Sequence, residues 1–198
     1  MRNWVSIPSA PPSEADLALM AAVAARDERA QRLLVERLSS RVRKVARLLC
    51  RTGADADDAA QLALLEILRS AQGFRVATSL ERWADRITVR TALRLRRREA
   101  SRTQLLVRWM SPGSLPWGGL GVSPEYESFG LETLLARLPS ERREALVLRH
   151  ALGYSVEEIA ELTAAPTGTV KDRLVSARKQ LRGLLERDLR RSSRGRAP

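Results

Sequence analysis

The spacing of apolar residues predicts helices along almost the whole N-terminal half of the chain. Ser13 and Asp16 can cap a short helix that runs to about residue 25, and Asp27 opens a much longer one. Apolar residues recur every three or four positions in the long helix, which gives it an inward stripe of Leu34, Leu38, Val42, Val45 and Leu49. Gly53 is expected to end this helix.

The segment that follows Gly53 predicts a helix with apolar residues on two sides. Its acidic start suits the positive end of a helix dipole, and this is a far commoner explanation of such carboxylates than a metal site. The inward face is formed by Ala60, Leu64, Ile67, Leu68 and Ala71. Leu62 and Leu65 project from the other side, among the polar residues Asp58, Gln61, Glu66 and Arg69. This pattern indicates a protein-binding surface, but neighbouring helices that cover both faces would leave the same pattern.

A further helix is predicted from about Ser79 to Arg98, and one of its faces is rich in arginine. Its inward face is Ala84, Ile87, Thr91 and Leu95. The other face interleaves one aromatic residue with basic ones, as Trp83, Arg86, Arg90, Arg94 and Arg97. Arginine neutralises phosphate and an indole stacks on an unpaired base, so this face favours single-stranded nucleic acid. The polar loop just upstream could hold an extruded base through Phe74, Arg75, Thr78 and Ser79.

Residues 155–179 have the pattern of a helix-turn-helix. Ser155 and Glu158 have the spacing of a capping box, and Pro166 interrupts helical geometry so that residues 164–166 form the turn. Thr167 is a candidate N-cap for the second helix. That helix has an inward face of Val170, Leu174, Ala177 and Leu181.

The opposite face of this second helix is predicted to read a DNA major groove. Placed at about 100° per residue, its members are Lys171, Asp172, Val175, Ser176 and Lys179, with Arg173 and Arg178 at the edges. Basic side chains bind phosphate or guanine, Asp172 could accept from a cytosine amino group, and Val175 could contact a thymine methyl. The alternative is a solvated charged face.

Composition supports a nucleic-acid partner and argues against several other classes of protein, such as enzymes and membrane proteins. The 198 residues contain 35 Lys and Arg against 23 Asp and Glu, a net charge of +12. Cys50 is the only cysteine and is expected to be buried, whereas the single histidine, His150, is expected to cap a helix end. No arrangement of catalytic residues is present, so we expect no enzyme activity, no cofactor, no metal and no small-molecule substrate. Without a long apolar run or a signal peptide, we expect a cytoplasmic protein that does not insert into membranes.

Gly and Pro gather between two helical regions, in SPGSLPWGGLGVSP. This segment predicts an all-helical protein of two small domains, covering residues 13–100 and 131–186, joined by a flexible linker over residues 101–130. Apolar linker residues such as Trp117 could dock elsewhere or simply cover the two domains. Residues 187–198 hold five Arg and one Asp, and they are expected to form a basic, disordered tail.

Three segments of this sequence resemble bacterial sigma factors of the sigma-70 family. DADDAAQLALLEIL is similar to their acidic, Gln-containing helix, WADRI to their W-x-x-R-I segment, and residues 138–182 to their C-terminal DNA-reading domain. The two-domain layout resembles the extracytoplasmic-function (ECF, group 4) sigma factors. This resemblance implies a subunit that binds core RNA polymerase, recognises the −35 and −10 promoter elements and helps to melt the latter. It also implies an anti-sigma protein as a partner.

The resemblance implies a role for each matching residue. Core polymerase would be bound by Asp58, Gln61, Leu62, Leu65 and Glu66. The −10 strand would be bound by Trp83, Arg86, Arg90, Arg94 and Arg97, with the loop of Phe74, Arg75, Thr78 and Ser79 taking a flipped base. The −35 element would be bound by Thr167, Thr169, Lys171, Asp172, Arg173, Val175, Ser176, Arg178 and Lys179.

The chain departs from the family pattern at three positions. Arg90 stands where Asn is usual and Arg94 where Asp is usual, which suggests heavier reliance on phosphate contacts. Ala164 stands where Gly is frequent, but a different turn type can absorb that change. Two alternatives remain, an ordinary helix-turn-helix regulator and a sigma-like decoy that sequesters an anti-sigma protein. The former would not need exposed leucines on an acidic helix, and the latter would not need the basic faces.

Overall fold

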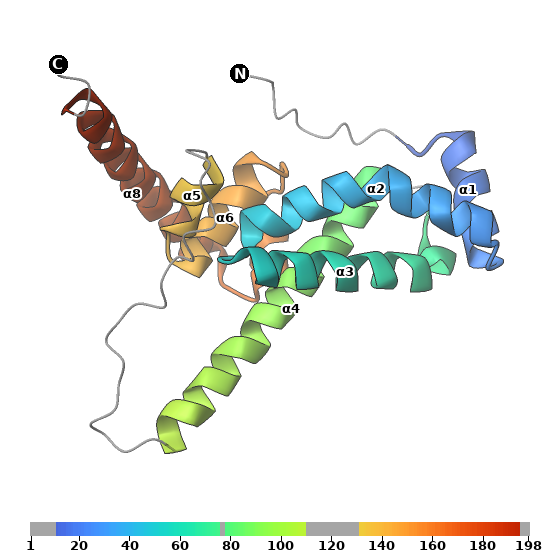
Figure 1. The fold of residues 1–198 in the computed structure, drawn as a ribbon, viewed down its shortest axis with the longest axis horizontal. Coiled ribbons are helices and arrows are strands. Elements are labelled where there is room, and N and C mark those ends of the chain that lie inside the picture. The colour runs from blue at the N-terminus through green and yellow to red at the C-terminus, as the bar shows by residue number, and fades with distance from the viewer. Residues whose placement is uncertain (1–10, 76–77, 110–130, 195–198) are drawn as a thin grey trace. The chain divides into compact units, whose positions relative to one another are not determined.

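The computed structural model describes residues 11–75, 78–109 and 131–194, and over these ranges every regular element is a helix. The helices form two compact units, which confirms the predicted all-helical, two-domain architecture (Figure 1). The first unit contains α1 (Glu14–Ala24), α2 (Glu28–Leu49), α3 (Gly53–Arg69), the 3₁₀ turn η1 (Ala71–Gly73) and α4 (Leu80–Trp109). The second contains α5 (Leu131–Ala136), α6 (Ser140–His150), α7 (Val156–Thr163) and α8 (Thr167–Arg194).

The core of the first unit lies where α2, α3 and α4 pack on one another. In Figure 1, α2 and α3 lie side by side and α4 crosses them, while α1 packs on α2, on α3 and on η1. The whole predicted stripe of α2 is buried, from Leu34 to Leu49. Small residues dominate the buried face of α3, so that the neighbouring helices approach closely; these residues are Ala56, Ala59, Ala60 and Ala63, followed by Ile67.

Four sequence-based predictions about the first unit need correction. Gly53 does not end α2, which stops at Leu49; Gly53 is the first residue of α3, after the N-cap Thr52. Leu64 and Leu68 are only half-buried, because the alanines rather than the leucines face the core. On α4, Ala84 and Thr91 are buried as predicted, but Ile87 and Leu95 are half-buried. Cys50 is half-buried rather than buried, since it lies at the C-cap of α2.

Two boundaries also lie further along the chain than the sequence pattern predicted. α4 continues to Trp109, so residues 101–109 of the predicted linker are helical; this stretch contains no Gly or Pro to stop a helix. α8 continues to Arg194, so most of the predicted disordered tail is also helical, and Asp188 is tied to Arg137 by an ion pair of 3.1 Å. Residues 110–130 of the linker and 195–198 of the tail lie outside the described residues, as do residues 1–10.

The second unit is built around α8. α5, α6 and α7 all pack against this helix, and the predicted inward residues Val170, Leu174 and Ala177 are buried while Leu181 is half-buried. Ile159 of α7 and Leu148 of α6 are completely buried on the opposing helices. The helix that carries the predicted DNA-reading face is therefore also the central helix of this unit.

Candidate nucleic-acid and polymerase interfaces

The helix-turn-helix of the second unit is held by a capping box and a left-handed turn. The Ser155 Oγ accepts from the Glu158 backbone N–H at 3.1 Å, and Glu158 Oε2 accepts from the Ser155 backbone N–H at 2.8 Å, as predicted. Ala164 adopts the left-handed conformation with φ of 52°, and the Ala165 N–H then reaches back to the Ala160 carbonyl at 3.0 Å. The turn therefore keeps left-handed geometry without glycine, and no different turn type is used. Thr167 is the first residue of α8 and not its N-cap.

α8 presents the predicted reading face to the outside of the unit. Lys171, Asp172 and Lys179 are exposed, and Val175 is 59% exposed, which is unusual for a β-branched apolar residue. Of the other predicted −35 residues, Thr167 and Arg178 are exposed, and Thr169, Arg173 and Ser176 are half-buried. The face combines donors, an acceptor and an apolar contact, the combination that direct readout of base edges uses.

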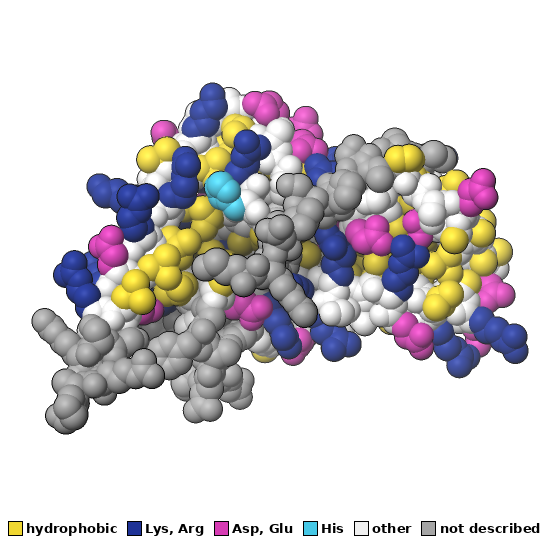
Figure 2. Space-filling view, turned by 90° about the horizontal axis from the view of Figure 1, so that it is seen from above, with side chains coloured by type: hydrophobic (Ala, Val, Ile, Leu, Met, Phe, Trp, Pro, Cys, Tyr) yellow, Lys and Arg dark blue, Asp and Glu magenta, His cyan; other side chains and the backbone are white. Residues whose placement is uncertain are grey.

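Arg149 of α6 adds a positive charge next to this face beyond α8 itself. His150 ends α6, and partial burial lowers its pKa, with further lowering from the nearby Arg178 and Arg149. The Glu157 pKa is lowered by hydrogen bonds to its own backbone N–H and to Ser155, and also by Lys171 and Arg149. At the left of the view in Figure 2, Lys and Arg side chains, with some Asp and Glu among them, lie around a band of hydrophobic side chains. Electrostatic attraction to DNA phosphates is the expected consequence.

The first unit brings the predicted base-stacking residues together. The rings of Phe74 and Trp83 meet edge to face, with centroids 5.3 Å apart and planes inclined by 71°. Both rings are half-buried, so part of each surface stays accessible. Arg75 is exposed, Thr78 is half-buried and Ser79 is buried; residues 76 and 77 of this loop lie outside the described residues. Along α4, Arg86 is half-buried, and Arg90, Arg94 and Arg97 are exposed.

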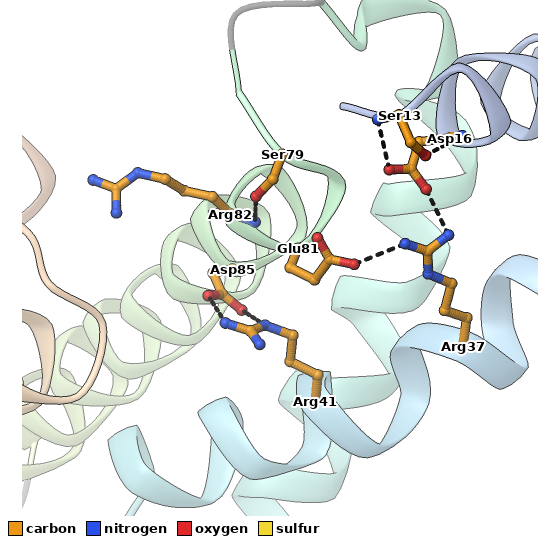
Figure 3. A network of polar contacts seen from close by, with 8 residues as sticks. All are labelled: Ser13, Asp16, Arg37, Arg41, Ser79, Glu81, Arg82 and Asp85. Atoms are coloured by element: carbon orange, nitrogen blue, oxygen red, sulfur yellow. Dashed lines mark hydrogen bonds and ion pairs between the residues drawn. The ribbon is translucent and has the colours of Figure 1, made fainter. Parts of the chain in front are cut away.

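Sequence reasoning missed the ion pairs that hold α4 against α2. Arg41 Nε and Nη2 donate to the two carboxylate oxygens of Asp85, each at 2.8 Å, and Arg37 donates to both Asp16 and Glu81 (Figure 3). A signal was present, because Arg37 and Arg41 are four residues apart, as are Glu81 and Asp85. Two such pairs on facing helices can bond in register.

The two buried carboxyls of this network have opposite pKa shifts. Burial raises the pKa of Asp85, and this effect outweighs the stabilisation of the carboxylate by Arg41. Burial acts in the same direction on Asp16, but there the Ser13 backbone N–H and the Arg37 guanidinium outweigh it, so its pKa lies below the ordinary value. Relative to an ordinary carboxyl, the folded unit therefore favours the charged form of Asp16 and disfavours that of Asp85.

The outer face of α3 carries the predicted polymerase-binding residues. Leu62 is 43% exposed and Leu65 is 47% exposed, so no described helix covers them. Asp58 and Gln61 are exposed beside them, and Glu66 is half-buried. Asp55 and Asp58 lie near Glu99, whose pKa is raised by burial and then by these two charges. Within the described ranges, no group of three or more acidic, His or Cys residues is arranged to hold a metal ion.

Comparison with known proteins matches both units. The family model of Sigma-70 region 2 matches residues 34–102, and that of Sigma-70 region 4 matches residues 128–181. The ECF RNA polymerase sigma factor SigM of Mycobacterium tuberculosis H37Rv is 36% identical over 171 residues, which cover 86% of this chain and 84% of SigM. The ECF RNA polymerase sigma-E factor of Escherichia coli K12 is 31% identical over 179 residues, which cover 84% of this chain and 92% of that protein.

Two solved structures share the fold at 25% sequence identity. CnrH in complex with the cytosolic domain of CnrY gives a TM-score of 0.52 and covers 88% of this chain and 99% of CnrH. The sigma factor RpoE in complex with the anti-sigma factor NepR, from Bartonella quintana, gives a TM-score of 0.54 and covers 77% of this chain and 94% of RpoE.

The two units and their matches define a transcription initiation factor of the sigma-70 class. Within that class, the chain belongs to the ECF family, and it is an RNA polymerase sigma factor. No observation favours the ordinary helix-turn-helix regulator or the decoy. Among the described helices, none has both the length and the apolar character that a membrane crossing requires.

Proposed function

We propose that three surfaces of this sigma factor bind core polymerase, the −10 strand and the −35 element, respectively. The outer face of α3 binds core polymerase through Asp58, Gln61, Leu62, Leu65 and Glu66. The Arg face of α4, with Trp83 and the loop that follows Phe74, captures the −10 strand. The outer face of α8 enters the −35 major groove. The observation that carries the proposal is the pair of leucines on α3, which are 43% and 47% exposed although the inner face of the same helix is fully packed.

Promoter opening in this scheme uses binding energy and needs no catalytic group. Once a base of the −10 strand unstacks, Trp83 offers it a ring surface and the arginines of α4 hold the backbone. Arg90 and Arg94 are both exposed, which supports their use as phosphate contacts. The factor would thus act in the cytoplasm as a binding protein rather than as an enzyme.

An anti-sigma protein is the partner we propose for regulation. CnrH and RpoE were both solved in complex with another protein, CnrY and NepR respectively, and NepR is an anti-sigma factor. The match covers most of the length of both CnrH and RpoE. The exposed apolar residues of α3 would suit such a partner when polymerase is absent.

Core binding is tested by the double substitution Leu62→Asp with Leu65→Asp. The variant should lose co-purification with core polymerase by at least about tenfold, the scale of buried interface anchors, and should lose transcription from the DNA upstream of its own gene. The matched control is Leu33→Asp on α2, because Leu33 is also an exposed leucine, at 55%. Equal loss in the control, or unfolding of the double variant in circular dichroism, would show that the α3 face is not the polymerase surface.

Base capture is tested by Trp83→Ala on two templates. Loss of one base–aromatic contact costs about 1 to 3 kcal/mol, and that contact forms only once the strand is unpaired. The variant should transcribe poorly from fully paired DNA and better from DNA with a pre-melted −10 bubble, with core binding unchanged. The same defect on both templates would assign Trp83 to packing alone.

A further inference from the structure

The N-terminal helix α1 lies outside the part of the chain that matches Sigma-70 region 2, which begins at residue 34. It is nevertheless firmly held in the first unit. Met20 and Val23 are each 2% exposed, and the helix packs on α2, α3 and η1. The capping box of Ser13 and Asp16 fixes its first turn, with both hydrogen bonds at 3.1 Å.

One arginine joins α1 to the start of α4. Arg37 of α2 donates through Nη1 to Asp16 Oδ1 and through Nη2 to Glu81 Oε1, the latter at 2.9 Å (Figure 3). The Asp16 carboxylate is almost fully buried, with its side chain 8% exposed, and its other oxygen accepts from the Ser13 backbone. The bridge thus has a rigid end on α1 and a more exposed end on Glu81, whose side chain is 32% exposed.

This bridge lies at the exit of the loop that leads from Phe74 to Ser79. Glu81 is in the first turn of α4, two residues before Trp83. Ser79 holds the same turn, since its Oγ accepts from the Arg82 N–H at 3.3 Å and its carbonyl accepts from the Trp83 N–H at 3.0 Å. At the loop entrance, η1 packs against α1 and ends at Gly73, directly before Phe74. α1 therefore contacts the entrance directly and is connected to the exit through Arg37.

We propose that Arg37 is a positioning residue for DNA opening, and that α1 holds Phe74 in place through η1 and Trp83 in place through the Asp16–Arg37–Glu81 bridge. The inference rests on the proposed role of the loop and Trp83. Aromatic rings that are held in place before DNA arrives lose less affinity to ordering on binding. The bridge keeps Trp83 against Phe74 in the arrangement that an unstacked base would meet.

The test compares Arg37→Met with Arg32→Met in transcription with core polymerase. Arg32 lies on the same helix and pairs with Glu28 in a strongly exposed contact, so it controls for loss of a surface charge. Arg37→Met should reduce transcription from fully paired templates by about three- to tenfold, the scale of a partly exposed ion-pair contact, and by less than about twofold on pre-melted templates. Arg32→Met should leave transcription from both templates unchanged. Arg37→Lys should recover part of the transcription that Arg37→Met loses.

A second variant separates positioning from simple stability. Glu81→Gln keeps the shape of the side chain and should reproduce the template dependence of Arg37→Met, and the double variant should be no worse than either single one. Equal loss on both templates, or a loss no greater than that of Arg32→Met, would overturn the inference. Trp83→Ala in the same assay identifies which proposal has failed. If Trp83→Ala depends on the template but Arg37→Met does not, only the proposed role of Arg37 is rejected. If Trp83→Ala shows no template dependence, the proposed base capture by Trp83 is rejected.

Discussion

At the scale of single residues, Ala164 shows how this protein departs from a common turn. Two residues other than glycine have positive φ in the part of the chain that the structure describes, Arg26 at 65° and Ala164 at 52°. A left-handed conformation costs an L-residue with a β-carbon about 1 to 2 kcal/mol. Ala164 is exposed, so no side-chain contact offsets this strain. The helix-turn-helix therefore holds its geometry against a local preference of its own sequence.

Replacing Ala164 by glycine should stabilise the second unit. The gain should be about 0.5 to 1 kcal/mol, since glycine removes the strain but adds entropy to the unfolded chain. The opposite substitution, Gly153→Ala, is the matched comparison, because Gly153 has φ of 69° and open space around it. It should destabilise the unit by about 1 kcal/mol. Denaturant melts of both variants give the measurement, and a destabilised Ala164→Gly would mean that the turn is not left-handed in solution.

The low pKa of Asp16 predicts a defined dependence of stability on pH. A carboxyl whose folded-state pKa is lowered contributes stability above its ordinary pKa, 3.8, and loses it as the pH falls through the lowered value. Asp16→Asn should therefore cost about 1 kcal/mol at pH 7, and this difference from the wild type should shrink below about pH 4. Melts at several pH values give the difference. The raised pKa of Asp85 changes the pH dependence of stability in the opposite direction. The stability of the wild type as a function of pH therefore does not isolate the contribution of Asp16.

At the scale of elements, the sequence predicted which residues lie on a helix face better than it predicted where each helix begins and ends. The inward stripe of α2 and the two faces of α8 follow from apolar periodicity, and the structure has both. Helix ends depend on local competition that periodicity does not capture. Gly53 was a plausible stop, yet Thr52 caps a new helix there through a bond of 3.1 Å to the Asp55 N–H. Beyond Arg98, the apolar spacing is lost, which predicted a linker. Residues with high helix propensity nevertheless keep the backbone helical to Trp109.

The candidate interfaces were predictable only as far as the sequence of a single helix determines them. The Arg face of α4 and the exposed leucines of α3 are properties of single amphipathic helices, so spacing revealed them. The Arg37 bridge joins residues that are distant in sequence, and it depends on how three helices pack. The Phe74–Trp83 contact joins a loop to the helix that directly follows it, but periodicity within one helix does not predict it. Paired charges four residues apart on two helices were the one available signal, and it does not identify which helices face each other.

The outer face of α8 should contain residues that read bases and residues that only attract DNA. Substituting Lys171 or Asp172, both exposed, should change the preferred −35 bases, each contact being worth about 1 to 3 kcal/mol of discrimination. Substituting Arg178, at the edge of the face, should weaken binding to all sequences and lower the slope of its salt dependence by about one. Binding of the variants to a set of single-base −35 substitutions, at several salt concentrations, separates the two classes. A uniform loss for Lys171 and Asp172 would contradict base reading by this face.

At the scale of the whole molecule, each unit has a core of its own and should unfold independently. Leu34 on α2 and Leu148 on α6 are both completely buried, one in each unit. Leu→Ala at such a position costs about 2 to 5 kcal/mol. Calorimetry should show two transitions, with Leu34→Ala lowering the first unit's transition and Leu148→Ala the second's. A single transition shifted by both variants would show that the units fold as one.

If α8 reads the promoter as we propose, its use in both the core and the DNA contact limits how promoter specificity can evolve. Val170, Leu174 and Ala177 face the core, and Lys171, Val175 and Lys179 alternate with them on the outside. Because each residue of a helix turns by about 100°, inserting or deleting one residue here would move every later core residue to the surface and bring charged residues inside. New promoters can therefore be acquired by exchanging side chains on the outer face, whereas changes in length within this helix would destroy the domain before they altered its specificity.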